Sequence, residues 1–209
     1  MRTALLFVLL LGAAGTLRAA GAMAEGIVYL KDGTRVEYTG RDRIELPRQW
    51  KDVKAFRNAF SKKKDKEKAT YQPSDIDSIV CWHPQGKEYP RKICFVPPMG
   101  WCWVYAENPH IRVLLYAKKG YILYSSGGMR ALYKQKTFNK TEMTFYLLKS
   151  GESDPYTIGG LLGNSSDAFR KRICAYIADD PDLCERIRQS SSIRSKTMGM
   201  LEEYAPQGR

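Results

Sequence analysis

Two histidines and two closely spaced aspartates are the residues of this chain best suited to acid–base chemistry. His83 and His110 are its only histidines, and Asp75 and Asp77 share one face if their segment is a strand. Paired carboxylates can catalyse glycoside hydrolysis, although an aspartate at such a place more often orders the entry to a strand. No G-x-S-x-G motif and no cysteine with a histidine signature is present, so no catalytic residue is assigned. A hydrolase stays an alternative that requires a pocket joining these aspartates to a histidine.

The cysteines near the middle of the chain could bind a metal or form a disulfide. Cys81, His83, Cys94 and Cys102 offer sulfur and nitrogen ligands, but their spacing matches no known zinc finger, so no metal site is predicted. In an oxidising compartment a disulfide is the better interpretation. Either Cys81 or Cys102 can lie opposite Cys94 in a hairpin; we favour Cys94–Cys102, with Cys81 buried and free.

The two remaining cysteines flank a helix break. Cys174 and Cys184 lie on either side of Asp180-Pro181, so a bridge between them would join two adjacent helices and stabilise the fold by ~2–3 kcal/mol. The alternative is two small buried apolar residues. Upstream, residues 159–163 (GGLLG) lack the known phosphate-loop motifs; they are interpreted as a linker, and no cofactor is predicted.

The first residues have the pattern of a cleavable secretory signal peptide. Arg2 is followed by the apolar run 4–12, and small residues lead to the A-x-A triplet Ala22-Met23-Ala24. The run is too short to span a bilayer, which takes ~20 residues. Residues 1–24 are therefore excluded from the fold, and we expect a secreted chain in the periplasm or cell envelope, with no transmembrane segment after cleavage.

The chain is basic, with a formal net charge of +12. Such a charge favours anionic partners. Trp50, Val53, Phe56 and Phe60 recur every three or four residues, which predicts an amphipathic helix over 48–61 leading into a lysine-rich loop. Its apolar face would either pack on the β-body or lie in a membrane interface. The candidate contacts to an anionic surface are Lys51, Lys54, Lys62, Lys63, Lys64, Lys66 and Lys68.

Most of the remaining chain has β patterns, and the end has helical ones. Asp32-Gly33 between 27–30 and 35–38 predicts a hairpin. Further short strands are expected at 76–82, 91–96, 101–105, 111–117, 121–124, 129–134 and 143–149. Three helices should follow, with caps at 164–167 and at Asp180-Pro181. The prediction is an α+β fold: a β-barrel-like module at 25–83 with an insertion at 48–68, an antiparallel meander at 84–160, and a helical C-terminal segment at 161–209.

Short motifs near both ends of the expected fold resemble those of known proteins. The hairpin at 26–33 (GIVYLKDG) and the segment 74–79 (SDIDSI) resemble an SH3-like or Sm-like β-barrel module, of the kind seen in secreted envelope proteins of Bacteroides-type bacteria. Residues 145–152, 169–171 and 180–183 resemble the closing segments of those proteins. Asp77-Ser78-Ile79 resembles their O-glycosylation motif. The family implied has no established activity and supplies no catalytic residues.

These observations favour a non-enzymatic binding or interaction protein of the envelope. The absence of a catalytic signature, the basic segment and the aromatic strands support this interpretation. The expected partner is an envelope protein, a glycan or an anionic lipid, and not nucleic acid. A protein held on a membrane surface by residues 48–68 is the second hypothesis.

Overall fold

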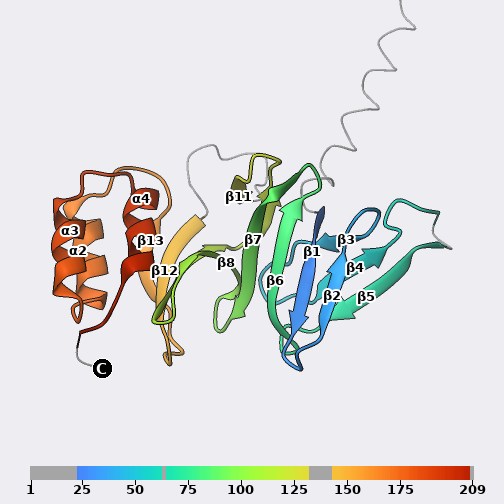
Figure 1. Ribbon diagram of the computed structural model, residues 1–209, viewed down its shortest axis with the longest axis horizontal. Coiled ribbons are helices and arrows are strands. Elements are labelled where there is room, and N and C mark those ends of the chain that lie inside the picture. The colour runs from blue at the N-terminus through green and yellow to red at the C-terminus, as the bar shows by residue number, and fades with distance from the viewer. Residues whose placement is uncertain (1–22, 63–64, 132–142, 208–209) are drawn as a thin grey trace, which may run out of the picture.

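The computed structural model describes residues 23–62, 65–131 and 143–207 (Figure 1). The chain first forms strands and then helices. The strands are β1 (Met23–Leu30), β2 (Arg35–Tyr38), β3 (Arg43–Glu45), β4 (Val53–Arg57), β5 (Glu67–Tyr71), β6 (Ile76–His83), β7 (Gly86–Val96), β8 (Gly100–Glu107), β9 (Ile111–Ala117), β10 (Tyr121–Leu123), β11 (Met129–Ala131), β12 (Met143–Lys149) and β13 (Tyr156–Gly160). The helices are α2 (Asp167–Tyr176), α3 (Pro181–Gln189), α4 (Arg194–Gly199) and the 3₁₀ helix η2 (Met200–Glu203).

One antiparallel sheet runs through most of the protein, in the order β13-β12-β9-β8-β7-β6-β1-β3-β4-β5. This confirms the predicted α+β class with a mostly antiparallel sheet. The strand order has two ends, so the described strands do not close into the predicted barrel. The predicted boundary at residue 83 falls inside the β6–β7 hairpin, so the sheet is continuous across it.

The N-terminal strand β1 is shared by three neighbours. On one side it pairs with β6. On the other side Met23 and Ala24 pair with β3, and residues 26–29 pair with β2. The predicted Asp32-Gly33 hairpin is confirmed as the β1–β2 connection, where Gly33 has a φ of 86° and the Asp32 carboxylate accepts the Thr34 N–H at 2.8 Å.

The predicted amphipathic helix over 48–61 is wrong. Residues 53–57 form β4, which pairs with β3 on one side and β5 on the other. Val53 and Ala55 are fully buried whereas Lys54 is exposed, which is the alternation of a strand. The helical spacing of Trp50, Val53 and Phe56 was misleading because ladder bonds on both sides of this segment satisfy its backbone.

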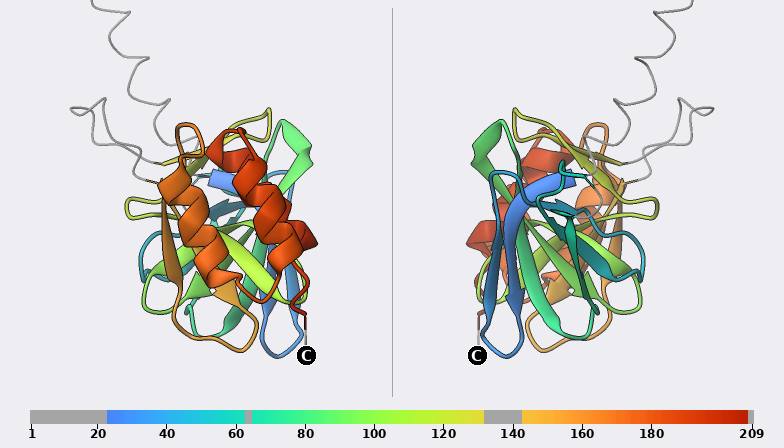
Figure 2. Two further views of the ribbon diagram at one scale, coloured as in Figure 1. Left: turned by 90° about the vertical axis from the view of Figure 1, so that its left-hand side faces the viewer. Right: turned by 90° about the vertical axis from the view of Figure 1, so that its right-hand side faces the viewer.

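The helices cover the sheet at the end opposite to β4 and β5 (Figures 1 and 2). Ser166 and Asp180 cap α2 and α3 as predicted, and Pro181 begins α3. One continuous hydrophobic core extends from Ala24 in β1 to Tyr204 beyond η2. A smaller cluster around Cys94, Cys102, Val104 and Leu114 alternates in sequence with the main core and therefore lies on the other face of the sheet.

Two segments of the chain differ from the sequence predictions. The linker predicted at 159–163 begins inside strand β13, in which Gly159 and Gly160 pair with β12. The predicted signal peptide lies outside the described residues up to position 22, but its last two residues, Met23 and Ala24, belong to β1. Within the described part of the chain, no helix is long and apolar enough to cross a bilayer.

Candidate functional site

The loop between β3 and β4, residues 46–52, is held against the β7–β8 hairpin. The Trp101 backbone N–H donates to the Gln49 carbonyl at 3.0 Å, and the Trp101 indole N–H donates to the Lys51 carbonyl at 2.9 Å. Gly100 lies so close to the Gln49 carbonyl that a Cβ on it would lie 2.2 Å from the carbonyl oxygen. Only glycine fits at position 100, and the two hydrogen bonds from Trp101 hold the loop against the hairpin.

The attachment of this loop presents an aromatic ring to solvent. Trp50 packs edge-on against Phe95, with ring centroids 5.0 Å apart, and Phe95 packs in the same manner on the buried Trp101. Trp50 nevertheless keeps 56% of its surface exposed. An exposed tryptophan held by such a chain of rings is suited to stacking on a ligand.

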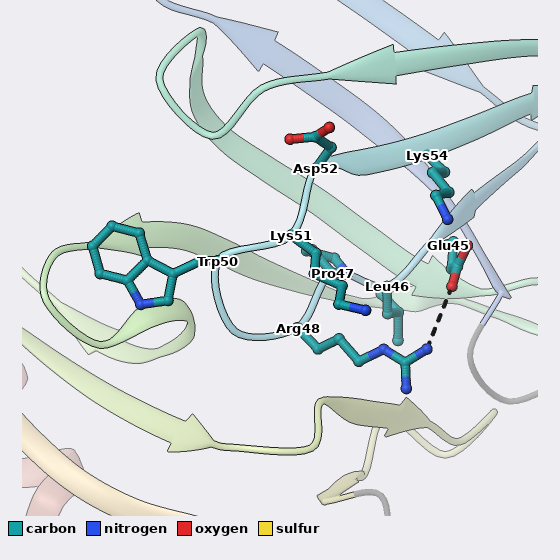
Figure 3. A pocket seen from close by; sticks show the side chains of 8 residues that line it. All are labelled: Glu45, Leu46, Pro47, Arg48, Trp50, Lys51, Asp52 and Lys54. Atoms are coloured by element: carbon teal, nitrogen blue, oxygen red, sulfur yellow. Dashed lines mark ion pairs between the residues drawn. The ribbon is translucent and has the colours of Figure 1, made fainter.

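A hollow of about 290 Å³ lies beside this loop (Figure 3). On one side of the hollow, three cationic groups point towards Glu45: those of Arg48, Lys51 and Lys54. Trp50 and Asp52 point away from these groups. Arg48 lies 3.9 Å from Glu45, an exposed pair of small energetic value. The lining of the hollow thus has three cations against two carboxylates, Glu45 and Asp52, which leaves one excess positive charge.

The same face continues along the β4–β5 hairpin. Lys54 is paired with Thr70 and Phe56 with Lys68, so these side chains project from one face of the sheet. The Lys66 ammonium lies 4.1 Å from the centroid of the Phe56 ring. We call Arg48, Lys51, Lys54, Lys66 and Lys68 the basic face.

The lysine residues predicted to contact an anionic surface are partly brought together here. Lys51, Lys54, Lys66 and Lys68 belong to the basic face, and Lys62 is exposed at the end of the described part of this hairpin. Lys63 and Lys64 lie outside the described residues. Between positions 48 and 68 the sequence has nine Lys or Arg residues against three acidic ones, which enriches positive charge at this end of the molecule. Arg48 and Trp50 were missed as site residues because only the loop geometry places them beside the lysines.

A second, larger groove of about 710 Å³ lies between β7, β8, the 126–128 turn and η2. Its cations are already paired: Lys92 lies 2.7 Å from Glu107, and Arg91 donates to the Gly127 carbonyl at 2.6 Å. The Arg91 guanidinium also lies over the ring of Trp103. Since these polar groups bind one another, this groove has less free binding capacity than the basic face.

The residues considered for catalysis are not brought together. Asp77 and His83 are both in β6, six residues and therefore about 20 Å apart. His110 lies in the β8–β9 turn, where its ring contacts Tyr204. Within the described ranges no group of three His, Cys, Asp or Glu side chains could hold a metal. Ser78, of the proposed glycosylation motif, is buried in β6.

The five cysteines are buried free thiols in the structure. Cys94 and Cys102 are direct cross-strand partners of β7 and β8. Burial raises the pKa of the Cys94 thiol to about 11, although Arg112 and Lys92 lower it.

The helical pair is also adjacent. The Cys174 and Cys184 thiols each donate to the carbonyl of the other residue, at 3.4 and 3.5 Å. Cys81 is fully buried, which raises its pKa to about 12. The predicted pairings thus have neighbouring partners, and the disulfides themselves stay predictions.

No family model, curated protein or solved structure matches this chain. The resemblance to envelope proteins of Bacteroides-type bacteria, and the export inferred from residues 1–24, therefore stay predictions.

Proposed function

We propose that this protein is an exported, non-enzymatic binding module of the cell envelope that holds an acidic glycan on its basic face. The observation that supports this most is the hollow at the β3–β4 loop, whose lining has three cations against two carboxylates and lies beside an exposed tryptophan. Carboxylate or phosphate groups of a glycan would bind to the cations, and a sugar ring would stack on Trp50.

The rigidity of the loop supports this function. Ordering a flexible loop on binding costs affinity, and a loop already held by Gly100 and Trp101 avoids that cost. Lys51 and Lys54 contribute charge without strong partners of their own among the described residues, so the first anion that arrives does not need to displace an ion pair.

A second candidate function is adhesion to an anionic membrane surface through the same hairpin. Phe60 is 73% exposed beyond the end of β4, close to the lysine-rich connection to β5. This candidate is weakened because the segment is a strand and not the predicted amphipathic helix. Trp50 and Phe60 lie beyond opposite ends of that strand and do not form one apolar stripe.

The test is binding of the exported protein to polygalacturonate, measured by calorimetry at 50 and 300 mM NaCl. We expect salt-sensitive binding that weakens by about 3- to 10-fold in Lys51→Ala/Lys54→Ala, since each lysine loses a charged contact. The matched control is Lys171→Ala/Lys196→Ala, which removes two exposed lysines from the helical end and should bind as the unmodified protein does.

The aromatic part of the site has its own test. Trp50→Ala should weaken binding to polygalacturonate and leave binding to phosphatidylglycerol vesicles unchanged. Binding to the vesicles alone would favour the membrane-surface function. Equal binding by the two lysine double variants, or no salt-sensitive binding to either probe, would overturn the proposal.

A further inference from the structure

The sequence around the start of β1 contains two overlapping A-x-A triplets. The first is Ala20-Gly21-Ala22 and the second is Ala22-Met23-Ala24. A signal peptidase cuts after such a triplet, so the exported chain could begin at Met23 or at Glu25. The sequence alone does not separate the two sites, because both have small residues at the required positions.

The structure gives the two residues between these sites a defined place. Met23 pairs with Glu45 and Ala24 pairs with Ile44, and these are the pairings that join β1 to β3 among the described strands. Ala24 is fully buried in the main core. A chain that begins at Glu25 would lose the whole β1–β3 ladder.

That ladder is also the strand pairing that joins the basic face to the rest of the sheet. In the strand order, β3, β4 and β5 follow β1 at the end of the sheet, and β3 is the strand that joins them to it. Without Met23 and Ala24, the three strands of the basic face would lose their strand pairing to the rest of the sheet. They would keep the hydrogen bonds of the β3–β4 loop to Trp101, their side-chain contacts and their covalent connections.

A chain that begins at Glu25 would also carry an α-ammonium group next to an existing ion pair. The Glu25 carboxylate forms an ion pair with the mostly buried Arg43 at 3.2 Å and accepts the indole N–H of Trp82 at 3.2 Å. An α-ammonium group on Glu25 would add positive charge beside Arg43, which the one carboxylate already balances.

We infer that the mature protein begins at Met23, after hydrolysis of the Ala22–Met23 peptide bond. One water is consumed, the carboxylate remains on Ala22, and the new α-ammonium forms on Met23 at the open end of β1. This inference rests on the proposed export of the protein, and it makes the position of cleavage a condition for a stable basic face.

The experiment is export of the full chain with a C-terminal tag, followed by intact mass measurement of the purified protein. We expect the mass of a chain starting at Met23. A mass starting at Glu25 would overturn the inference and leave export intact, whereas an uncleaved chain would overturn the export on which it rests.

Two variants test which triplet is used. Ala20→Asp places a charge in the first triplet only, and we expect it to abolish the Met23 product, leaving either uncleaved chain or a Glu25 product. The matched control Ala19→Asp, one residue outside both triplets, should still give Met23. Unchanged processing of Ala20→Asp would overturn the inference.

The structural reason has a separate readout. A protein that begins at Glu25 should unfold with a Tm lower by at least about 3 °C than one that begins at Met23. Relative to the chain that begins at Met23, amide exchange in β3 should become faster. Exchange in β9, which is remote from the lost ladder, should stay the same. Equal Tm values and equal exchange in β3 would refute the role assigned to Met23 and Ala24.

Discussion

Asp180 is the residue whose replacement should most clearly destabilise the helical end. It is 5% exposed, and its carboxylate makes two contacts. One oxygen caps α3 by accepting the Leu183 N–H at 3.0 Å, and the other accepts the Ala205 N–H at 2.9 Å. Asp180 therefore begins a helix and also holds the C-terminal segment beside it.

The expected cost of Asp180→Ala follows from these two contacts. Loss of an N-cap costs about 1 kcal/mol. Loss of the acceptor for the partly buried Ala205 N–H costs about 0.5–1.5 kcal/mol more. Together they lower the free energy of unfolding by about 1.5–2.5 kcal/mol, which is a fall in Tm of about 3–10 °C for a chain of this size.

The assay is urea unfolding followed by circular dichroism, with thermal unfolding alongside it. Asp180→Ser keeps a capping oxygen but cannot reach Ala205, so its loss of stability should be intermediate. The matched control Asp154→Ala removes an exposed carboxylate from the β12–β13 connection and should change stability by less than about 0.5 kcal/mol. A change of under 0.5 kcal/mol in Asp180→Ala would refute the reasoning.

Three other predictions concern buried or partly buried groups. Tyr121→Phe should cost about 1–3 kcal/mol in urea unfolding, because the fully buried hydroxyl donates to the Leu115 carbonyl at 2.7 Å and accepts the Ala117 N–H at 3.1 Å, and both contacts are lost; an unchanged midpoint would contradict this. Partial burial raises the pKa of Asp179, but hydrogen bonds from Lys149 and Tyr204 outweigh it, so the pKa lies below the ordinary value of an aspartate. Its contribution to stability is therefore complete above about pH 4 and is lost as pH falls through the folded pKa, and Asp179→Asn should flatten the acid side of the stability–pH curve. Oxidation should join Cys174 to Cys184 and raise the free energy of unfolding by about 2–3 kcal/mol; peptide mapping of exported protein that finds both thiols free would contradict this.

Local sequence signals determined much of the β-body and the start of two helices. Asp32-Gly33 gave the first hairpin because a glycine there can take positive φ. The strands β9 and β12 have the predicted bounds of 111–117 and 143–149, since each is an apolar run between turn residues. Asp180-Pro181 fixed the start of α3 because a capping carboxylate and a proline at the first position act within one turn.

Contacts distant in sequence decided the candidate site. Apolar residues in and around 53–57 have the spacing of a helix, yet residues 53–57 form a strand that pairs with β3 and β5. Hydrogen bonds to these two neighbours satisfy the backbone N–H and C=O groups, which a helix would satisfy by its own internal hydrogen bonds. Arg48 and Trp50 join the lysines through a loop held by Gly100 and Trp101, which lie about 50 residues further along the chain. The positive charge of this segment was visible in the sequence, but the surface that presents it was not. Such a surface depends on the register between strands, and only the folded sheet sets that register.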